Sequence, residues 1–120
     1  MENVEVSYCD TDIAIVKLFG EHDMAHSEEL SKILHRVLGA RDLLIVDLSE
    51  AEFIDSSILN SLIAARRTAD RAGLKMTIQL GPEATVARVL ELSGLNGFLA
   101  CAGSREEAIA LTRNGSGVAA

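Results

Sequence analysis

Three consecutive polar residues, Asp55-Ser56-Ser57, are placed where phosphoryl chemistry is possible. They follow the apolar pair Phe53-Ile54, and an amphipathic pattern begins directly after them at Ile58. Two hydroxyls and a carboxylate are therefore expected together at the start of a helix. Helix N-termini hold anions well, because their first backbone N–H groups are unpaired and carry partial positive charge. The cluster is thus a suitable place for a phosphate to bind or to be attached.

The elements upstream of this cluster follow from the spacing of apolar residues. Alternation over Val4–Tyr8 and a nearly continuous apolar run over Ile13–Phe19 predict two strands, joined by a short polar link as a hairpin. Gly20–Asp23 is expected to turn the chain. A helix ending at Gly39 then presents one apolar face, formed by Leu30, Ile33, Leu34, Val37 and Leu38. The apolar run Leu43–Leu48 predicts a central strand that is covered on both faces.

Helices and strands alternate downstream of the cluster. The helix that starts there should end at Gly73 and bury one stripe, made of Ile58, Leu62, Ala65, Ala69 and Ala72. Lys75–Leu80 predicts a strand, and Gly81-Pro82 is expected to start a helix that Ser93-Gly94 ends. Phe98–Ala102 predicts a short last strand. Ser104 and Glu107 have the spacing of a capping box, so a final helix is expected to run to about Thr112.

This order predicts an α/β fold with a mixed, mostly parallel sheet of about five strands and about four helices, including one N-terminal antiparallel hairpin. A single domain is expected over residues 1–113, and the Gly- and Ala-rich residues 114–120 are expected to form a flexible tail. The total of 120 residues suits one domain that builds its own core.

Composition restricts the kinds of partner. The net charge of −7 argues against nucleic acid and anionic membranes, which bind basic surfaces. Cys9 and Cys101 have no metal-ligand spacing and are expected to be reduced thiols. The chain shows no charged-then-apolar leader and no apolar run of 18 residues, so a cytoplasmic protein is expected. The absence of a Gly-rich phosphate loop predicts no bound cofactor.

With these elements in place, the chain resembles the STAS domain family, which is named after sulfate transporters and anti-sigma factor antagonists. The resemblance covers about residues 4–112. It is carried by three groups of residues in this sequence, namely Leu18-Phe19-Gly20-Glu21 with Asp23, then Leu44-Ile45-Val46-Asp47-Leu48-Ser49 with Phe53-Ile54-Asp55-Ser56-Ser57, and finally Leu92-Ser93-Gly94-Leu95. The resemblance implies the STAS fold and a regulatory binding module rather than an enzyme.

Within the anti-sigma antagonist branch, the resemblance also implies a phosphorylation switch. The serine directly after the aspartate is phosphorylated there by an anti-sigma factor that is also a serine kinase, and a PP2C-type phosphatase reverses the reaction. Ser56 is the expected phosphosite, with Ser57 as the alternative acceptor or as a simple helix cap. Asp55 is expected to cap the helix, and also to orient the serine hydroxyl or to hold a metal-nucleotide during phosphoryl transfer; the capping and functional roles can coexist. The residues expected to support the phosphosite and to dock the partner are Asp55, Ser57, Ile58, Asn60 and Asp23.

The chain departs from this branch directly after the serines. The branch usually continues with glycine, leucine and glycine, whereas this chain has Ile58, Leu59 and Asn60. These residues are expected to add bulk at a helix start that glycines would leave open to a partner. The departure keeps a second reading open, in which the chain is a STAS subunit that docks constitutively in a lipid-transport ATPase complex or a stress-signalling assembly. The resemblance also implies a third reading, a small-ligand sensor, because STAS domains can bind nucleotides, but no phosphate-binding motif in this sequence supports it.

Other chemistry is poorly supported by the sequence. A hydrolase built on Ser56 lacks a Gly-x-Ser-x-Gly motif, and the histidines all lie upstream of this serine. His22, Asp23 and His26 could contact a metal, but a third firm ligand is missing, so no metal site is expected. Arg66, Arg67 and Arg71 are interpreted as a solvated helix face.

Overall fold

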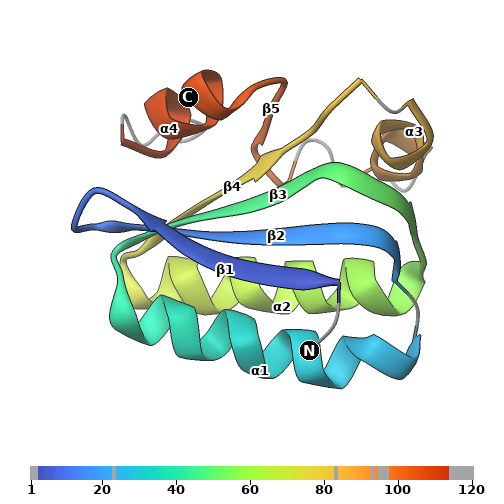
Figure 1. Cartoon of the computed structure of the whole chain (residues 1–120). Coiled ribbons are helices and arrows are strands. Elements are labelled where there is room, and N and C mark those ends of the chain that lie inside the picture. Colours follow the sequence, from blue (N-terminus) through green and yellow to red (C-terminus); the bar gives the residue numbers. More distant parts are fainter. Residues whose placement is uncertain (1–2, 23, 83, 93, 95–97, 114–120) are drawn as a thin grey trace.

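Five strands form one mixed sheet in the order β1-β2-β3-β4-β5 (Figure 1). The computed structural model describes residues 3–22, 24–82, 84–92, 94 and 98–113. β1 pairs antiparallel with β2, and the remaining neighbours pair in parallel. The elements in chain order are β1 (Val4–Cys9), β2 (Ile13–His22), α1 (Met24–Ala40), β3 (Leu43–Ile54), α2 (Ser56–Ala72), β4 (Lys75–Gln79), α3 (Ala84–Leu92), β5 (Cys101–Ala102) and α4 (Arg105–Arg113). The predicted fold class and element order are confirmed.

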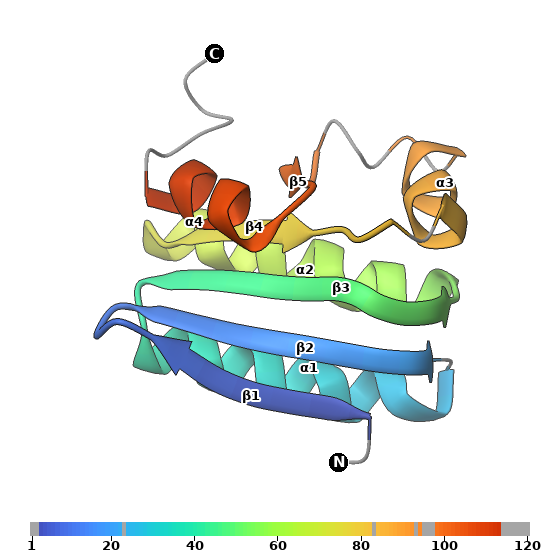
Figure 2. The same ribbon diagram turned by 45° about the horizontal axis from the view of Figure 1, so that its top comes forward.

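Helices cover the two faces of the sheet unequally. α1 and α2 lie side by side across one face, while the shorter α3 and α4 lie on the other side, near β3 and β4 (Figures 1 and 2). The main core lies under α1 and α2 and includes the expected apolar face of α1 and that of α2 except for Ala72, which is exposed. Val86 and Leu90 of α3 also belong to this core. A smaller core lies under α4, where Ala108 packs with Ile15 and Ile45. The parallel strands are therefore apolar on both faces where α4 covers them.

β3 is longer than the sequence suggests, since it runs to Ile54 rather than ending at Leu48. Its pairing with β2 shifts register twice, and each shift adds one residue to β3. Leu48, Ala51 and Ile54 consequently reach the core at intervals that a regular strand cannot produce. The alternation used to recognise a strand is lost at these bulges, which is why the prediction ended too early.

Several other boundaries differ from the predicted ones. Gly20 does not turn the chain but lies within β2, with φ at 66°, and the strand continues to His22. α1 passes through Gly39 to Ala40. β5 contains two residues instead of five, and β4 ends one residue earlier than expected. Gly73 and Gly94 follow α2 and α3 with φ of 73° and 77°, as predicted for helix ends.

The loop after β4 packs closely against β3. A Cβ atom on Gly81 would lie 2.7–2.9 Å from the backbone and Cβ of Ser49, so only glycine fits without a shift. α3 begins at Ala84 rather than at Gly81-Pro82, which makes this prediction wrong by two to three residues. Gly81 therefore serves close packing and does not start the helix.

α4 is capped at its start and tied to the first hairpin at its end. Its first turn is capped by Ser104, whose Oγ accepts a hydrogen bond from the Glu107 N–H at 3.1 Å, as the capping-box spacing predicted. At its last residue, Arg113 donates to Asp10 at 2.7 Å and to Asp12 at 3.0 Å, both in the turn between β1 and β2. These bonds join the final helix to the first hairpin.

Three further expectations concern the cysteines, membrane-spanning helices and the C-terminal tail. Cys9 and Cys101 are free cysteines, as expected. Across the part of the chain that the structure describes, none of the helices has the length and apolar character needed to span a membrane. The predicted tail at 114–120 lies outside the described residues.

Candidate functional site

Asp55 caps the start of α2, at the end of the bulged strand β3. Its backbone is extended, with φ at −104° and ψ at −177°, and its Oδ1 accepts hydrogen bonds from the N–H groups of Ser57 at 3.0 Å and Ile58 at 3.2 Å. A carboxylate at this position satisfies orphan N–H groups and also favours the positive end of the helix dipole. The capping geometry expected for Asp55 is present.

The two serines of the cluster differ in their surroundings. The Oγ of Ser57 donates to Oδ1 of Asp55 at 2.5 Å, and the residue is half-buried. Ser56 is exposed on the first turn of α2, and its hydroxyl bonds to none of the described residues. The Ser57 hydroxyl is therefore occupied by the cap, whereas Ser56 is exposed to solvent.

A line of serine hydroxyls joins α1 to the first turns of α2. Ser61 is buried and accepts a hydrogen bond from Oγ of Ser31 at 2.9 Å. Its own Oγ lies 3.2 Å from the carbonyl oxygens of Ser27 and Ser57. Residue spacing does not predict this contact, although Ser61 lies beside the buried stripe of α2, three residues after Ile58. The contact positions the first turns of α2 against α1.

The residues that follow the serines do not share one role. Ile58 is fully buried in the main core, and Leu59 is nearly so. The expectation that Ile58 adds bulk to a docking surface is wrong, because its side chain points from the helix into the core. Asn60 is exposed on α2. The departure from the antagonist branch therefore alters the surface at Asn60 and the core at Ile58.

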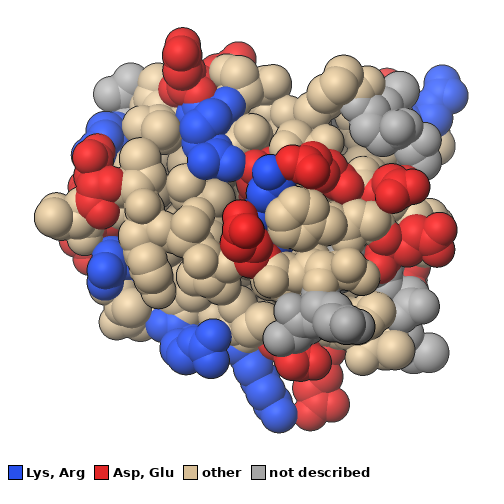
Figure 3. Space-filling view, viewed as in Figure 1, with Lys and Arg blue, Asp and Glu red and all other residues tan. Residues whose placement is uncertain are grey.

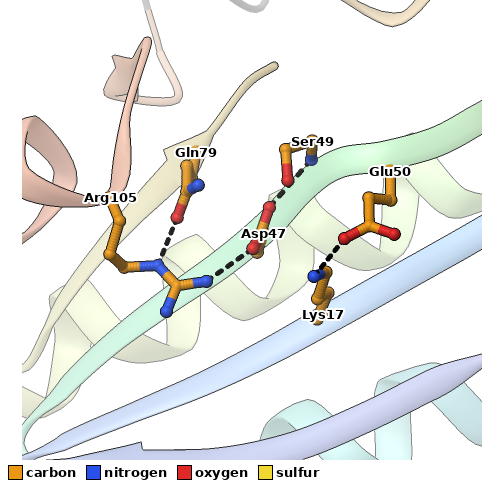
Figure 4. A network of polar contacts seen from close by, with 6 residues as sticks. All are labelled: Lys17, Asp47, Ser49, Glu50, Gln79 and Arg105. Atoms are coloured by element: carbon orange, nitrogen blue, oxygen red, sulfur yellow. Dashed lines mark hydrogen bonds and ion pairs between the residues drawn. The ribbon is translucent and has the colours of Figure 1, made fainter.

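A network of polar side chains lies on β3 and its neighbours, upstream of the cluster (Figure 4). Asp47 is buried and accepts from Nη2 of Arg105 at 2.6 Å and from the Ser49 N–H at 2.8 Å. Nε of Arg105 donates to Gln79 at 2.5 Å. A buried carboxylate requires such partners, because an unpaired charge in the interior is costly. The network binds α4 to β3 and β4.

An ion pair beside this network lies at the first bulge of β3. Lys17 pairs with Glu50 (Figure 4). The ammonium of Lys17 also lies 5.1 Å from the ring centroid of Phe19. The hydrogen bond to Glu50 raises the pKa of Lys17, so this side chain is cationic at neutral pH. The pair joins β2 to β3 at the first register shift, upstream of Asp55.

The remaining candidates from the sequence have other positions. Arg66 is not on a solvated face, since it donates to Asp70 at 2.9 Å and to the carbonyl of Phe98 at 2.6 Å, and its guanidinium lies over the Phe98 ring. Arg67 and Arg71 are exposed, as expected. Asp23 lies outside the described residues, so its expected docking role stays a prediction. The described residues contain no group of three or more His, Cys, Asp or Glu side chains suited to hold a metal.

Comparison with known proteins identifies the class to which this fold and site belong. The STAS domain family profile matches residues 6–108. The chain therefore belongs to the STAS domain family. No curated protein matches its sequence at a significant level.

Solved structures extend the comparison. The unphosphorylated anti-sigma factor antagonist SpoIIAA aligns with 25% identity and a TM-score of 0.76, covering 92% of this chain and 96% of that one. The phosphorylated Bacillus SpoIIAA aligns at 23%, with a TM-score of 0.68 and coverages of 89% and 96%. An anti-sigma factor antagonist from Mycobacterium paratuberculosis aligns with 24% identity and a TM-score of 0.81, and the alignment covers 92% of each chain. A sulfate transporter family protein from Wolinella succinogenes aligns with 14% identity and a TM-score of 0.70, covering 95% of this chain and 93% of that one.

Proposed function

We propose that this chain is a cytoplasmic anti-sigma factor antagonist whose binding is switched by phosphorylation of Ser56. In this proposal the unmodified protein binds an anti-sigma factor with serine kinase activity and so releases a sigma factor. Phosphorylation of Ser56 ends that binding, and a PP2C-type phosphatase restores it. The main support is the difference between the two serines, because Ser56 is exposed while the Ser57 hydroxyl is bonded to Asp55. The chain acts as a binding module and not as an enzyme.

The surroundings of Ser56 suit a switch that leaves the fold intact. A phosphate adds about −1.5 to −2 charges at neutral pH, and the helix dipole favours an anion there by about 0.3–1 kcal/mol. The side chain of Asp55 already accepts from two N–H groups of this first turn and presents a like charge. Attraction to the helix and repulsion from Asp55 therefore oppose each other. The modification changes the docking surface far more than the stability.

Phosphoryl transfer itself tests this proposal. The purified protein is incubated with ATP and, in turn, with each anti-sigma kinase of its source organism, and the product is analysed by mass spectrometry. Ser57→Ala is the matched control, since it keeps the exposed hydroxyl, whereas Ser56→Ala removes it. We expect phosphate on the wild type and on Ser57→Ala, and none on Ser56→Ala. Phosphate confined to Ser57, or none with any kinase, contradicts the switch.

A phosphate mimic separates switching from unfolding. Ser56→Asp should weaken binding to the same kinase, while its melting temperature stays within about 4 °C of the wild type, because opposing electrostatic contributions of about 1 kcal/mol or less act at this position. An unfolded Ser56→Asp protein would mean that the effect is structural.

Constitutive docking is the second candidate function. In this alternative the chain is a STAS subunit of a lipid-transport ATPase complex or of a stress-signalling assembly. The exposed Asn60 favours it, since the antagonist branch usually has a glycine at this position on the helix surface. Transporter genes beside the coding gene, together with the lack of any phosphorylation, would support this alternative.

A further inference from the structure

Part of the second sheet face has no helix over it. Figure 2 looks down onto this side, where α3 and α4 lie near β3 and β4 and none of the described elements crosses β1 or the second half of β2. α4 packs on β3, β4 and β5, and α3 packs on β3. Beyond Ile15, the residues of β2 that point to this side are Lys17 and Phe19, which are partly exposed. This face is therefore available to a partner.

Carboxylates surround the exposed rings on this face. We define the acidic aromatic surface by six residues on β1, β2 and β3, namely Glu5, Lys17, Phe19, Glu50, Glu52 and Phe53. Glu5, Glu50 and Glu52 are exposed, and Lys17 is already paired with Glu50. Figure 3 shows acidic side chains gathered around uncharged surface over the far ends of β2 and β3. The surface is thus negatively charged, and a complementary partner must be basic.

Phe53 supplies an apolar contact beside the switch. Its side chain is 44% exposed, although it lies in a strand whose neighbour Ile54 is fully buried. It is paired with Glu21 across the second bulge and precedes Asp55 by two residues. Aromatic side chains are enriched at the buried centres of protein interfaces, and polar groups form the surrounding rim. The bulges therefore place an aromatic side chain at the rim of the switch site.

An open depression borders the same surface. It has a volume of about 410 Å³ and lies between the bulged part of β3 and the loop after β4. Its lining includes Glu50, Glu52 and Pro82. Two carboxylates at its edge favour a long basic side chain as its occupant, since Arg and Lys carry an apolar stem and a cationic head.

We propose that the acidic aromatic surface is a second part of the docking site for the anti-sigma kinase, and that it binds a basic face of that protein which also carries an apolar contact. This inference rests on the proposed function. It extends the site from the start of α2 onto the open sheet, so that the partner covers both the Ser56 hydroxyl and the bulged end of β3. Phe53 provides the apolar anchor, and the carboxylates steer the basic partner to the site.

The first test measures affinity for the kinase that modifies Ser56. Phe53→Ser should weaken binding about 10- to 40-fold, because burying the remaining 44% of a ring of about 200 Å² removes about 90 Å² from water. Tyr8→Ser is the matched control, since Tyr8 is 52% exposed at the other end of β1 and lies outside the defined surface. Glu52→Lys should slow association about three- to tenfold at low salt, while Glu106→Lys on α4 should not. Melting temperatures verify that each variant folds.

Carboxyl footprinting provides the second test. In the complex, Glu50 and Glu52 should be protected from carbodiimide-driven labelling, while Glu106 and Glu107 should remain reactive. If the kinase binds the wild type and all four variants equally and leaves Glu50 and Glu52 reactive, this docking surface is wrong and the proposed function stands. If no anti-sigma kinase binds the wild type, the proposed function fails and this inference fails with it.

Discussion

Replacing Asp55 should separate the capping role of this residue from its charge. Asp55→Ala removes the acceptor of two backbone N–H groups, which costs about 1–2 kcal/mol for a typical N-cap. It also removes the acceptor of the Ser57 hydroxyl. The hydrogen bond lost in this way contributes about 0.5–1 kcal/mol net to stability at a half-buried site. The total is about 2 kcal/mol. For 120 residues the unfolding entropy is about 0.25 kcal/mol/K, so the melting temperature should fall by about 8 °C.

Asp55→Asn is the matched control for this substitution. Asparagine caps helices about as well as aspartate, so the variant loses mainly the attraction of the charge to the helix dipole, about 0.3–1 kcal/mol. Its melting temperature should fall by less than about 4 °C. Thermal unfolding followed by circular dichroism measures both shifts, and urea titration checks that the m-value is unchanged. Equal losses for the two variants would refute the capping argument, as would no loss in Asp55→Ala.

Three other predictions concern the core, the packing of glycine and a thiol. Ile58→Gly restores the residue usual in the antagonist branch. It should lower the free energy of unfolding by about 3–6 kcal/mol, because it empties a fully buried site and places a glycine in a helix. Urea unfolding measures this loss, and a variant as stable as the wild type would contradict the burial of Ile58. Gly81→Ala should destabilise the protein, because the added Cβ would lie 2.7 Å from the Ser49 carbonyl oxygen and would force the two segments apart. Gly39→Ala in α1 is the control, since its Cβ would enter open space, and it should be neutral or stabilising by up to about 1 kcal/mol. Equal melting temperatures for the two variants would contradict the close packing at Gly81. Burial raises the pKa of the Cys101 thiol, so at pH 8 a smaller fraction is thiolate in the folded protein than in the unfolded protein. Iodoacetamide should therefore label Cys101 more slowly in the folded protein than in urea. Equal labelling rates, measured by mass spectrometry, would contradict this prediction.

The sequence predicted the order of elements because most of them follow simple periodicity. The apolar spacing of α1 and α2 and the continuous apolar runs of β2 and β3 were sufficient for the class of fold. The errors lie where tertiary packing overrides local pattern. The second half of β3 has no regular alternation because of its two bulges, and β5 is too short to show any period. Gly20 predicts a turn because glycine is frequent in turns, but it lies within β2 with a positive φ.

The candidate site was predicted in position but not in detail. Capping residues act over two or three positions, so Asp55 and its serines could be assigned from spacing alone. The hydrogen bond that distinguishes Ser57 from Ser56 depends on side-chain conformation, which spacing does not encode. The burial of Ile58 follows from its place on the core stripe of α2, whereas the resemblance implied a docking role for the same residue.

The bonds of Arg113 have a consequence for folding during synthesis. They connect residues 101 and 103 positions apart, from the last helix to the first turn. The β1–β2 hairpin can form early, but this tie cannot exist until residue 113 has left the ribosome. α1, α2 and the first four strands must therefore be held by their own core during translation, and the first hairpin acquires its final restraint with the last helix.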